Sequence, residues 1–290
     1  DKQTLSMNAL DAEKKIGKKT KAIIFQHTFG IPGDIEEIGK LAKENNLLLI
    51  EDCAHIIGGS YKNKKLGTFS DAAIFSFGRD KVISSVFGGA VITSNKSLGE
   101  KIKKIQNLAP YPSLNWVYQQ LFHPFFTSIV LYLFFINRLL GNLSLFVFRK
   151  IGFIVKPDIT TLPQKYPNSL AFLAFSQLNR IAEFNKKRLD AFKLYKKELV
   201  NLNLNLPTEE HFYLRVPILV DNKDKLFSYF KSRNIYLGDW YSNVIDPKSA
   251  GSCPNAKDIA KKIVNLPSYP ALSLRDVQKV VTLLRDYYGN

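Results

Sequence analysis

A lysine between an apolar run and a glycine pair is the first feature of this sequence that suggests chemistry. Lys81 follows the run AAIFSF and precedes Gly88 and Gly89. A lysine amine that is held neutral near a carbonyl cofactor can form a Schiff base. Asp52 ends another apolar run, LLLIE, and a carboxylate at that place could pair with a pyridinium nitrogen and improve the electron sink. The two residues are therefore candidates for the same cofactor chemistry.

Two more polar residues lie close to this pair in the sequence. Ser76 offers a hydroxyl group to a phosphate, and His55, three residues beyond Asp52, could stack on a cofactor ring. Each residue alone also has an ordinary explanation, because a single lysine is usually solvated and a single histidine is usually structural. Only their joint arrangement carries the hypothesis.

The elements that must position these residues form an alternating pattern between Lys21 and about Asn95. Residues 21–25, 47–51, 72–77 and 89–94 are predicted strands, and residues 34–46 are a predicted helix with Asp34 as its N-cap. Strands that are continuously apolar predict a mostly parallel α/β sheet with both faces covered. Ligands bind at the carboxyl ends of such strands, where Asp52 and Ser76 stand.

The middle of the chain has a different character. No Asp, Glu, Lys or Arg occurs between Ile105 and Asn137, and residues 121–136 are apolar at most positions. This run falls short of the roughly 20 residues of a spanning helix, so residues 121–155 are predicted to form an interfacial or re-entrant hairpin with its basic residues at lipid phosphates. The alternative is an apolar flap that packs on the protein or in a dimer interface.

The remainder of the chain is predicted to be a smaller α+β domain. One or two long helices are expected over residues 168–202, a strand over 213–220, a helix over 222–235, and a closing helix from Ser273, its N-cap, to Tyr288. The chain is thus expected to comprise a partial cofactor-binding large domain (1–107), the apolar insert (108–157), and the long helix with the small domain (158–290).

Composition limits the possible partners. The chain has 41 Lys and Arg against 25 Asp and Glu, a formal charge of +16, which suits an anionic membrane surface or a phosphate-bearing substrate. No nucleic-acid module organises the basic residues, so nucleic acid is not an expected partner. Cys53 and Cys253 are far apart and lack metal-ligand spacing, so neither a disulfide framework nor a metal site is expected, and a reducing cytoplasm fits.

The segment from Leu47 to Asn95 resembles the core of the DegT/DnrJ/EryC1/StrS family, the sugar aminotransferases among the fold-type I pyridoxal-phosphate enzymes. The matching residues are Glu51, Asp52, Ala54 and His55; Gly67, Asp71, Ser76 and Phe77; Lys81; and Gly88 and Gly89. Residues 19–38 and 263–280 also resemble the family, so the likeness covers nearly the whole chain except the apolar insert.

This resemblance implies a fold, a cofactor and roles. It implies that Lys81 carries pyridoxal 5'-phosphate as a Schiff base and later moves the substrate proton, that Asp52 pairs with the pyridine nitrogen, that His55 stacks on the ring, and that Ser76 holds the phosphate. Relatives that dehydrate sugars have histidine in place of Lys81, so the resemblance favours amino transfer. The implied activity converts a keto-sugar, expected to be nucleotide-linked, into an amino-sugar with a donor such as glutamate. The implied assembly is a homodimer with a shared active site.

Two departures from the family pattern keep alternatives open. The upstream S-G-T segment is absent, which suggests an N-terminal truncation, and Pro163 and Gln164 stand where an N-x-R segment is expected, with Asn168 out of register. One alternative is a non-catalytic, membrane-docked protein with this fold in a binding or regulatory role. Another is a pyridoxal-phosphate sugar dehydratase, which would need no amino donor. The expected location is the cytoplasm, with the insert at the inner membrane face.

Overall fold

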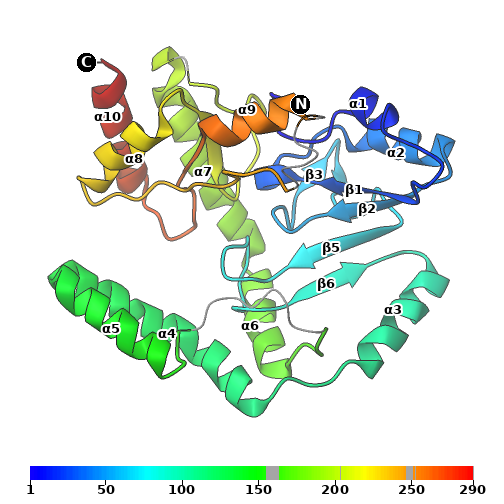
Figure 1. Ribbon diagram of the computed structural model, residues 1–290, viewed down its shortest axis with the longest axis horizontal. Coiled ribbons are helices and arrows are strands. Elements are labelled where there is room, and N and C mark those ends of the chain that lie inside the picture. Colours follow the sequence, from blue (N-terminus) through cyan, green and yellow to red (C-terminus); the bar gives the residue numbers. More distant parts are fainter. Residues whose placement is uncertain (155–162, 203, 246–250, 252, 290) are drawn as a thin grey trace. The chain divides into compact units, whose positions relative to one another are not determined.

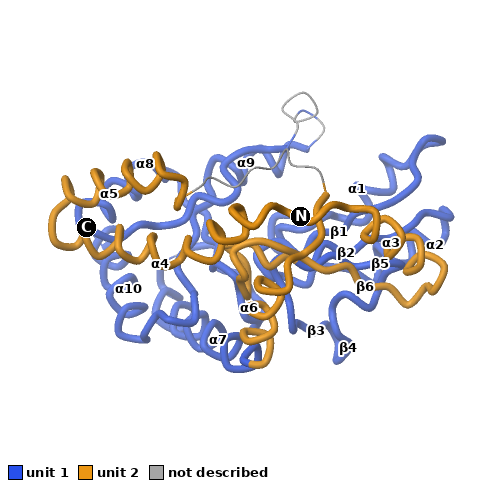
Figure 2. Tube along the Cα trace, turned by 90° about the horizontal axis from the view of Figure 1, so that it is seen from below, with its two compact units in different colours: residues 1–75, 180–290 blue, residues 76–179 orange. Residues whose placement is uncertain are grey.

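The computed structural model describes residues 1–154, 163–202, 204–245, 251 and 253–289. The chain divides into two compact units, shown in different colours in Figure 2. Unit 1 comprises residues 1–75 and 180–290, and unit 2 comprises residues 76–179. Both large clusters of buried apolar side chains belong to unit 1, so this unit contains the main core among the described residues.

The elements follow one another along the chain as Figure 1 labels them. The first part contains α1 (Ala9–Glu13), β1 (Ala22–Gln26), η1 (Thr28–Gly30), α2 (Ile35–Glu44), β2 (Leu48–Asp52), β3 (Ser60–Tyr61), β4 (Lys64–Lys65) and β5 (Ala72–Ser76). The middle part contains β6 (Gly89–Ile92), α3 (Lys96–Leu108), α4 (Leu114–Ile136), α5 (Arg138–Lys150) and α6 (Asn168–Leu178). The last part contains α7 (Ile181–Glu198), η2 (Val200–Leu202), β7 (Val216–Leu219), α8 (Lys223–Lys231), α9 (Pro254–Lys262), β8 (Ile263–Leu266) and α10 (Leu274–Gly289).

The main sheet has the strand order β1-β2-β5-β6. Strand β1 pairs with β2 in parallel, and β2 pairs with β5 in parallel. The register sets Gln26 opposite Asp52 at the carboxyl end of the first pair. The predicted strands and their parallel arrangement are thus confirmed for these pairs, and the predicted α/β class is correct.

Helix α2 covers one face of this sheet. Its buried residues Ile35, Ile38 and Leu41 join the same cluster as Phe25 and Leu49 on the strands. Helix α2 matches the predicted helix, and Asp34 stands at its N-cap position, although the Asp34 side chain makes no capping hydrogen bond.

The expectation that both faces of the sheet are covered is wrong for the described residues. Ile24, Leu48 and Ile74 are 59%, 54% and 42% exposed, and burial alternates along β1 and β2. The strands carry apolar side chains on both faces of the sheet, but the described helices cover only one of these faces. The sequence run alone therefore overstates the burial of this sheet.

The C-terminal part of unit 1 is the predicted α+β structure. Strands β7 and β8 pair antiparallel, with Val216 opposite Leu266. Helices α7, α8 and α10 contribute the buried residues Phe192, Phe230 and Val281 to the cluster around these strands. Helix α10 begins as predicted: the Asp276 N–H donates to Ser273 Oγ (3.2 Å), and the Ser273 N–H donates back to Asp276 Oδ2 (3.3 Å).

The apolar insert is helical, and its first helix is longer than the apolar run in the sequence suggests. Helix α4 has 23 residues and contains Pro124, and α5 packs against it. The Ser113 hydroxyl accepts a hydrogen bond from the Trp116 N–H (3.3 Å) and starts α4 well before the apolar run. Among the described residues, α4 is one helix that is long and apolar enough to cross a membrane, by length and composition alone, and 11% of its most apolar window is buried. The expectation that this segment is too short to span is therefore wrong as a statement about length.

Candidate active site

Asp52 and Ser76 are the last residues of β2 and β5, as predicted. Asp52 and His55 belong to unit 1, whereas Ser76 and Lys81 belong to unit 2. The structure thus presents two groups of predicted residues. We call the first the strand-end group, residues 51–55, and the second the lysine loop, residues 77–88 together with Ser76.

The Asp52 carboxylate is held by two hydrogen bonds. Its Oδ2 accepts from Gln26 Nε2 (2.8 Å), and its Oδ1 accepts from the Ala54 N–H (3.0 Å). Gln26 is able to reach Asp52 because the parallel register sets the two residues side by side at the ends of their strands. The carboxylate is half-buried and fixed in direction, which suits an acceptor for a charged ring N–H group.

The His55 ring is buried and lies among aromatic rings. It stacks on Trp240 (centroids 5.7 Å apart, interplanar angle 20°) and on Tyr241 (6.1 Å, 19°), and it is 6.4 Å from Phe29. The Phe29 N–H donates to His55 Nδ1 (3.2 Å), so this nitrogen carries a lone pair and the ring is neutral. His55 Nε2 lies 3.3 Å from the Tyr241 hydroxyl. The ring is therefore oriented by a backbone donor and by flat neighbours.

Sequence reasoning missed Gln26, Trp240 and Tyr241. Burial, and then the Asp52 carboxylate, raise the pKa of Tyr241 to about 12, so its hydroxyl stays protonated near neutral pH. Strand pairing could have suggested Gln26, because it ends the strand before Asp52. No short-range signal marks Trp240 and Tyr241, which lie almost two hundred residues farther along the chain.

A buried polar network lies beside Asp52. The Glu51 carboxylate accepts hydrogen bonds from four groups: the Gly67 N–H (2.8 Å), the Phe69 N–H (2.8 Å), Ser70 Oγ (2.9 Å) and His27 Nε2 (3.1 Å). Burial alone would raise the pKa of Glu51, but these hydrogen bonds outweigh it and hold the pKa below its ordinary value. The network fixes the end of β2 from the core side.

Cys53 also lies near this network, and three possible metal-ligand atoms of His27, Glu51 and Cys53 are within 4.8 Å of one another. The other ring nitrogen of His27 is bonded to the Pro32 carbonyl (2.8 Å), and the Glu51 oxygens are occupied by their donors. Burial raises the pKa of the Cys53 thiol, so the thiolate that a metal needs is disfavoured. The cluster is a structural network of the strand end.

Ser76 and Lys81 approach each other around Gly78. A Cβ atom placed on Gly78 would lie 3.5 Å from Ser76 Oγ and 3.7 Å from Lys81 Cγ. The Gly78 N–H points to Ser76 Oγ (3.4 Å), and the Lys81 N–H donates to the Gly78 carbonyl (3.3 Å). The turn thus brings a hydroxyl group and a lysine stem together on one side of a glycine.

The rest of the lysine loop is held by side chains from later in the chain. The Tyr166 hydroxyl is hydrogen-bonded to Ser85 Oγ, and its ring lies so close to Gly88 that a Cβ atom there would overlap it. The Gln177 amide brackets the backbone of Ser84: Nε2 donates to its carbonyl (2.5 Å), and Oε1 accepts from its N–H (3.0 Å). No pattern in the sequence predicts these contacts.

The two groups suit different parts of pyridoxal phosphate. A fixed carboxylate and a flat neutral ring in the strand-end group match a pyridinium nitrogen and a ring face. A hydroxyl group and a lysine around a glycine turn match a phosphate and an aldehyde. The residues present are therefore chemically compatible with the cofactor, and their roles remain predictions.

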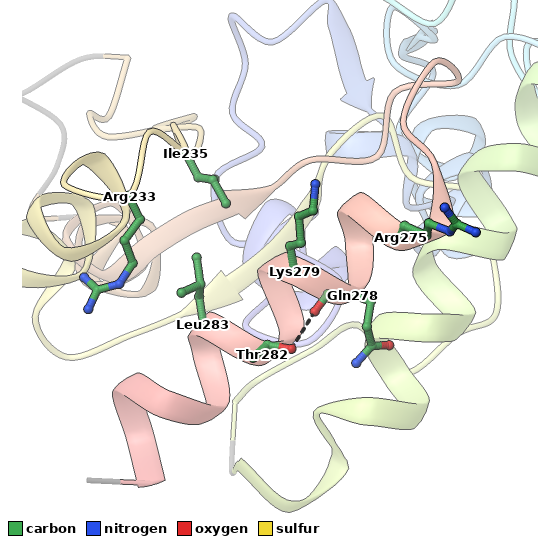
Figure 3. A pocket seen from close by; sticks show the side chains of 7 residues that line it. All are labelled: Arg233, Ile235, Arg275, Gln278, Lys279, Thr282 and Leu283. Carbon is green, nitrogen blue, oxygen red and sulfur yellow. Dashed lines mark hydrogen bonds between the residues drawn. The ribbon is translucent and has the colours of Figure 1, made fainter.

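A pocket elsewhere in unit 1 contains none of the predicted residues. Figure 3 shows it between α10 and the segment after α8, with Arg233, Arg275 and Lys279 among its lining residues and a volume of about 620 Å³. Lys279 is already paired with Asp276 (3.2 Å), and Arg233 donates to the Tyr229 carbonyl (3.1 Å). Two of the basic side chains that line this pocket are therefore already held by neighbouring groups.

Comparisons with known proteins agree with the sequence resemblance. The model of the DegT/DnrJ/EryC1/StrS aminotransferase family matches residues 1–117 and 160–285, which leaves out most of the α4 and α5 segment. The chain is 28% identical to GDP-perosamine synthase from Escherichia coli O157:H7, over 100% of this chain and 72% of that protein. It is 26% identical to dTDP-3-amino-3,6-dideoxy-alpha-D-galactopyranose transaminase from Aneurinibacillus thermoaerophilus, over 99% of this chain and 71% of that protein.

Solved structures show the same fold. A DegT DnrJ EryC1 StrS aminotransferase from Brucella abortus superposes with a TM-score of 0.76 at 18% identity, covering 100% of this chain and 72% of that one. The fold-type I architecture predicted from the sequence is thus confirmed. Since the family model spans both groups of candidate residues, the chain belongs to the DegT/DnrJ/EryC1/StrS aminotransferase family, whose members depend on pyridoxal phosphate.

Proposed function

We propose that this protein transfers an amino group from an amino acid such as glutamate to a nucleotide-linked keto-sugar and so makes an amino-sugar for surface polysaccharide or glycan synthesis. The observation that carries the proposal is the presence of Lys81 beside Ser76 in a segment that the aminotransferase family model matches. The named relatives are nucleotide-sugar aminotransferases, which supports the same substrate class.

In the proposed mechanism the residues bind and orient, and Lys81 moves a proton. When bound, the cofactor supplies an electron sink for the carbon that loses or gains the proton. Asp52 would accept from the ring N–H group, and His55 would lie along the ring face. Ser76 would donate its hydroxyl group to the phosphate. The free Lys81 Nζ would accept the proton from the α-carbon of the amino donor and, in the second half of the reaction, would donate a proton to the sugar carbon that receives the amino group.

Chemical trapping tests this assignment directly. The full chain is mixed with pyridoxal phosphate and reduced with borohydride, and the modified lysine is mapped by mass spectrometry. We expect the label on Lys81 and its loss in Lys81→Ala. The matched control is Lys103→Ala on the exposed side of α3, which should retain full labelling. Absence of label from the wild-type chain would refute the proposal that the protein is a pyridoxal-phosphate enzyme and would leave the non-catalytic alternative.

Turnover separates the two enzyme alternatives. Keto-sugar nucleotides are supplied with and without glutamate, and amino-sugar and dehydrated product are measured. Amino-sugar that forms only with glutamate supports transamination. Dehydrated product without any amino donor would instead support the dehydratase.

A specific observation also favours a membrane surface as a partner. We infer that α4 and α5 bind an anionic lipid surface from the cytoplasmic side. Residues 101–157 contain no Asp or Glu, while Arg138, Arg149 and Lys150 occur in α5. Phe135 is 89% and Leu139 is 77% exposed, so a large apolar area would otherwise face water.

Vesicle binding tests this inference. The double variant Phe135→Ser with Leu139→Ser should co-sediment less with phosphatidylglycerol vesicles than the wild-type protein, by about tenfold or more in the partition coefficient. Leu10→Ser is the matched control, because Leu10 is 69% exposed on α1. Equal sedimentation of wild-type protein and double variant would exclude the lipid surface and favour a protein-covered flap.

We also infer a homodimer with a shared active site, on the strength of the family resemblance alone. Light scattering after gel filtration should give twice the chain mass of 33.0 kDa. Mixed dimers of Lys81→Ala and Asp52→Asn then test whether Lys81 and Asp52 of one site come from different subunits, because recovery of about a quarter of wild-type activity requires that both changes fall in one site and leave the other site intact. A monomer at working concentration would contradict the inference.

A further inference from the structure

Helix α4 contacts the lysine loop at two points. The Arg79 guanidinium donates through Nη2 to Gln120 Oε1 (3.0 Å), and the Gln120 side chain is 2% exposed. The Phe87 ring packs edge-on against Trp116, with centroids 5.3 Å apart and an interplanar angle of 82°. One contact lies two residues before Lys81 and the other six residues after it, so α4 holds both sides of the loop.

The two contacts come from one face of the helix. Trp116 and Gln120 are four residues apart, a spacing that places side chains above one another on an α-helix. His123 continues this face by one turn: burial, and then the Arg79 charge, lower the pKa of His123. The other faces of α4 carry the exposed residues Phe125 and Phe135. The helix thus has an inner face on the loop and an outer apolar surface.

We propose that Gln120 and Trp116 are positioning residues for the lysine loop, so that the apolar hairpin supports the active site. The proposal rests on the proposed function, because it takes Lys81 to be the lysine that bears the cofactor. The contacts are made to Arg79 and Phe87, on either side of Lys81 in the sequence, so their effect passes through the loop backbone.

The physical reason is the cost of an unsatisfied charged group. The Arg79 side chain is half-buried, and this partial removal from water lowers the pKa of its guanidinium. The Gln120 side-chain oxygen accepts a hydrogen bond from this cation and so satisfies one of its donors. Loss of the acceptor leaves a half-buried guanidinium with one fewer partner, so the loop would shift to find a new one. A shift of the loop changes both the position of the lysine and the field that it experiences.

Three variants separate positioning from general stability. Gln120→Leu removes the acceptor at nearly constant volume, and Gln120→Glu restores an acceptor. Gln106→Leu makes the same chemical change at an exposed position of α3 and is the matched control. Thermal melting by circular dichroism, measured first, shows whether each variant is folded.

The first readout needs no cofactor. Hydrogen exchange is followed by mass spectrometry in peptides that cover residues 77–88 of the cofactor-free protein. We expect exchange there to be about tenfold faster in Gln120→Leu. Gln120→Glu should return it to within about twofold of wild type, and Gln106→Leu should leave it unchanged. Exchange in peptides from β7 and β8 provides the internal reference, because these strands are buried in unit 1.

The second readout uses the loaded enzyme. The pH dependence of the visible absorption band of bound pyridoxal phosphate should shift in Gln120→Leu and return in Gln120→Glu. The turnover number should fall by about tenfold, with the KM for the amino donor changed by less than about twofold. A merely structural role would lower the yield of folded protein and leave this pH profile in place.

The outcomes are distinct. Unchanged exchange over residues 77–88 in a folded Gln120→Leu variant would overturn the positioning proposal, whatever the labelling of Lys81. Absence of borohydride label on Lys81 in the wild-type protein would overturn the proposed function, while the exchange experiment would still measure the support of the loop. Faster exchange together with a shifted pH profile supports both.

Discussion

The strand-end group and the lysine loop both contain predicted site residues, but different kinds of contact hold these two regions in place. The strand end continues a parallel sheet, and a fully buried carboxylate, Glu51, ties it to the core. The lysine loop has no regular structure and contains two positive backbone φ angles, 71° at Val86 and 121° at Gly88. Its contacts are side chains from helices or segments far along the chain. The first geometry depends on the whole fold, whereas the second depends on a few replaceable contacts.

The largest effect is expected from breaking the strand end at its buried carboxylate. Glu51→Gln keeps the size of the side chain but removes the charge that four donors share. We expect the free energy of unfolding to fall by about 3 to 5 kcal/mol, because one partner of a buried ionic network is lost. Urea unfolding at neutral pH measures this. A loss below about 1 kcal/mol would show that the network is not essential to the core.

The same residue predicts a pH dependence. The pKa of Glu51 is lowered in the folded protein from an ordinary value of 4.5, so its carboxylate binds fewer protons when folded than when unfolded. Its contribution is therefore present above about pH 4.5 and is lost as the pH falls through the lowered value. Urea midpoints between pH 6 and 3 should decline more steeply in the wild-type protein than in Glu51→Gln. Parallel declines would contradict this account.

The next effect is expected in the lysine loop. Gly88→Ala places a Cβ atom against the Tyr166 ring at a φ angle of 121°. We expect the free energy of unfolding of unit 2 to fall by about 2 to 4 kcal/mol. Borohydride labelling of Lys81 should be weaker as well. Gly99→Ala is the matched control: its Cβ atom would lie 3.6 Å from Thr93 Cγ2, an ordinary contact, within helix α3. That change should leave stability equal or raise it by up to about 1 kcal/mol.

The comparison also explains what the sequence could predict. Apolar runs separated by helical periodicity predicted β1, β2, β5 and α2, because these patterns follow local side-chain geometry. Asp52 and Ser76 could be placed at strand ends for the same reason. Capping chemistry likewise predicted the start of α10 at Ser273.

The features that could not be predicted from the sequence depend on contacts between segments that are far apart in the chain. Nothing near Tyr241 in the sequence indicates that its ring lies beside His55, and nothing near Gln120 indicates a bond to Arg79. The length of α4 was underestimated because polar residues such as Gln119 belong to its first turns. The exposed face of the sheet was missed because apolar composition does not state which face a helix covers. These features are set by tertiary packing, which a single sequence does not encode locally.

The smallest effect is the most informative about the difference between the regions. Gln177→Leu removes both hydrogen bonds that its amide makes to the Ser84 backbone, at a half-buried place on α6. The free energy of global unfolding should change by less than about 1 kcal/mol, since the loop adds little to the core. Hydrogen exchange at Ser84 and its neighbours should nevertheless rise by about tenfold.

Gln177→Glu sharpens this last prediction, because it keeps the acceptor for the Ser84 N–H and loses the donor to its carbonyl. Its exchange rate should fall between those of wild type and Gln177→Leu. If instead the two variants lowered the free energy of unfolding as much as Glu51→Gln is expected to, the lysine loop would be part of the cooperative core. Local opening without global loss would mean that the loop can be adjusted by its helices, α4 included, while the strand end stays fixed.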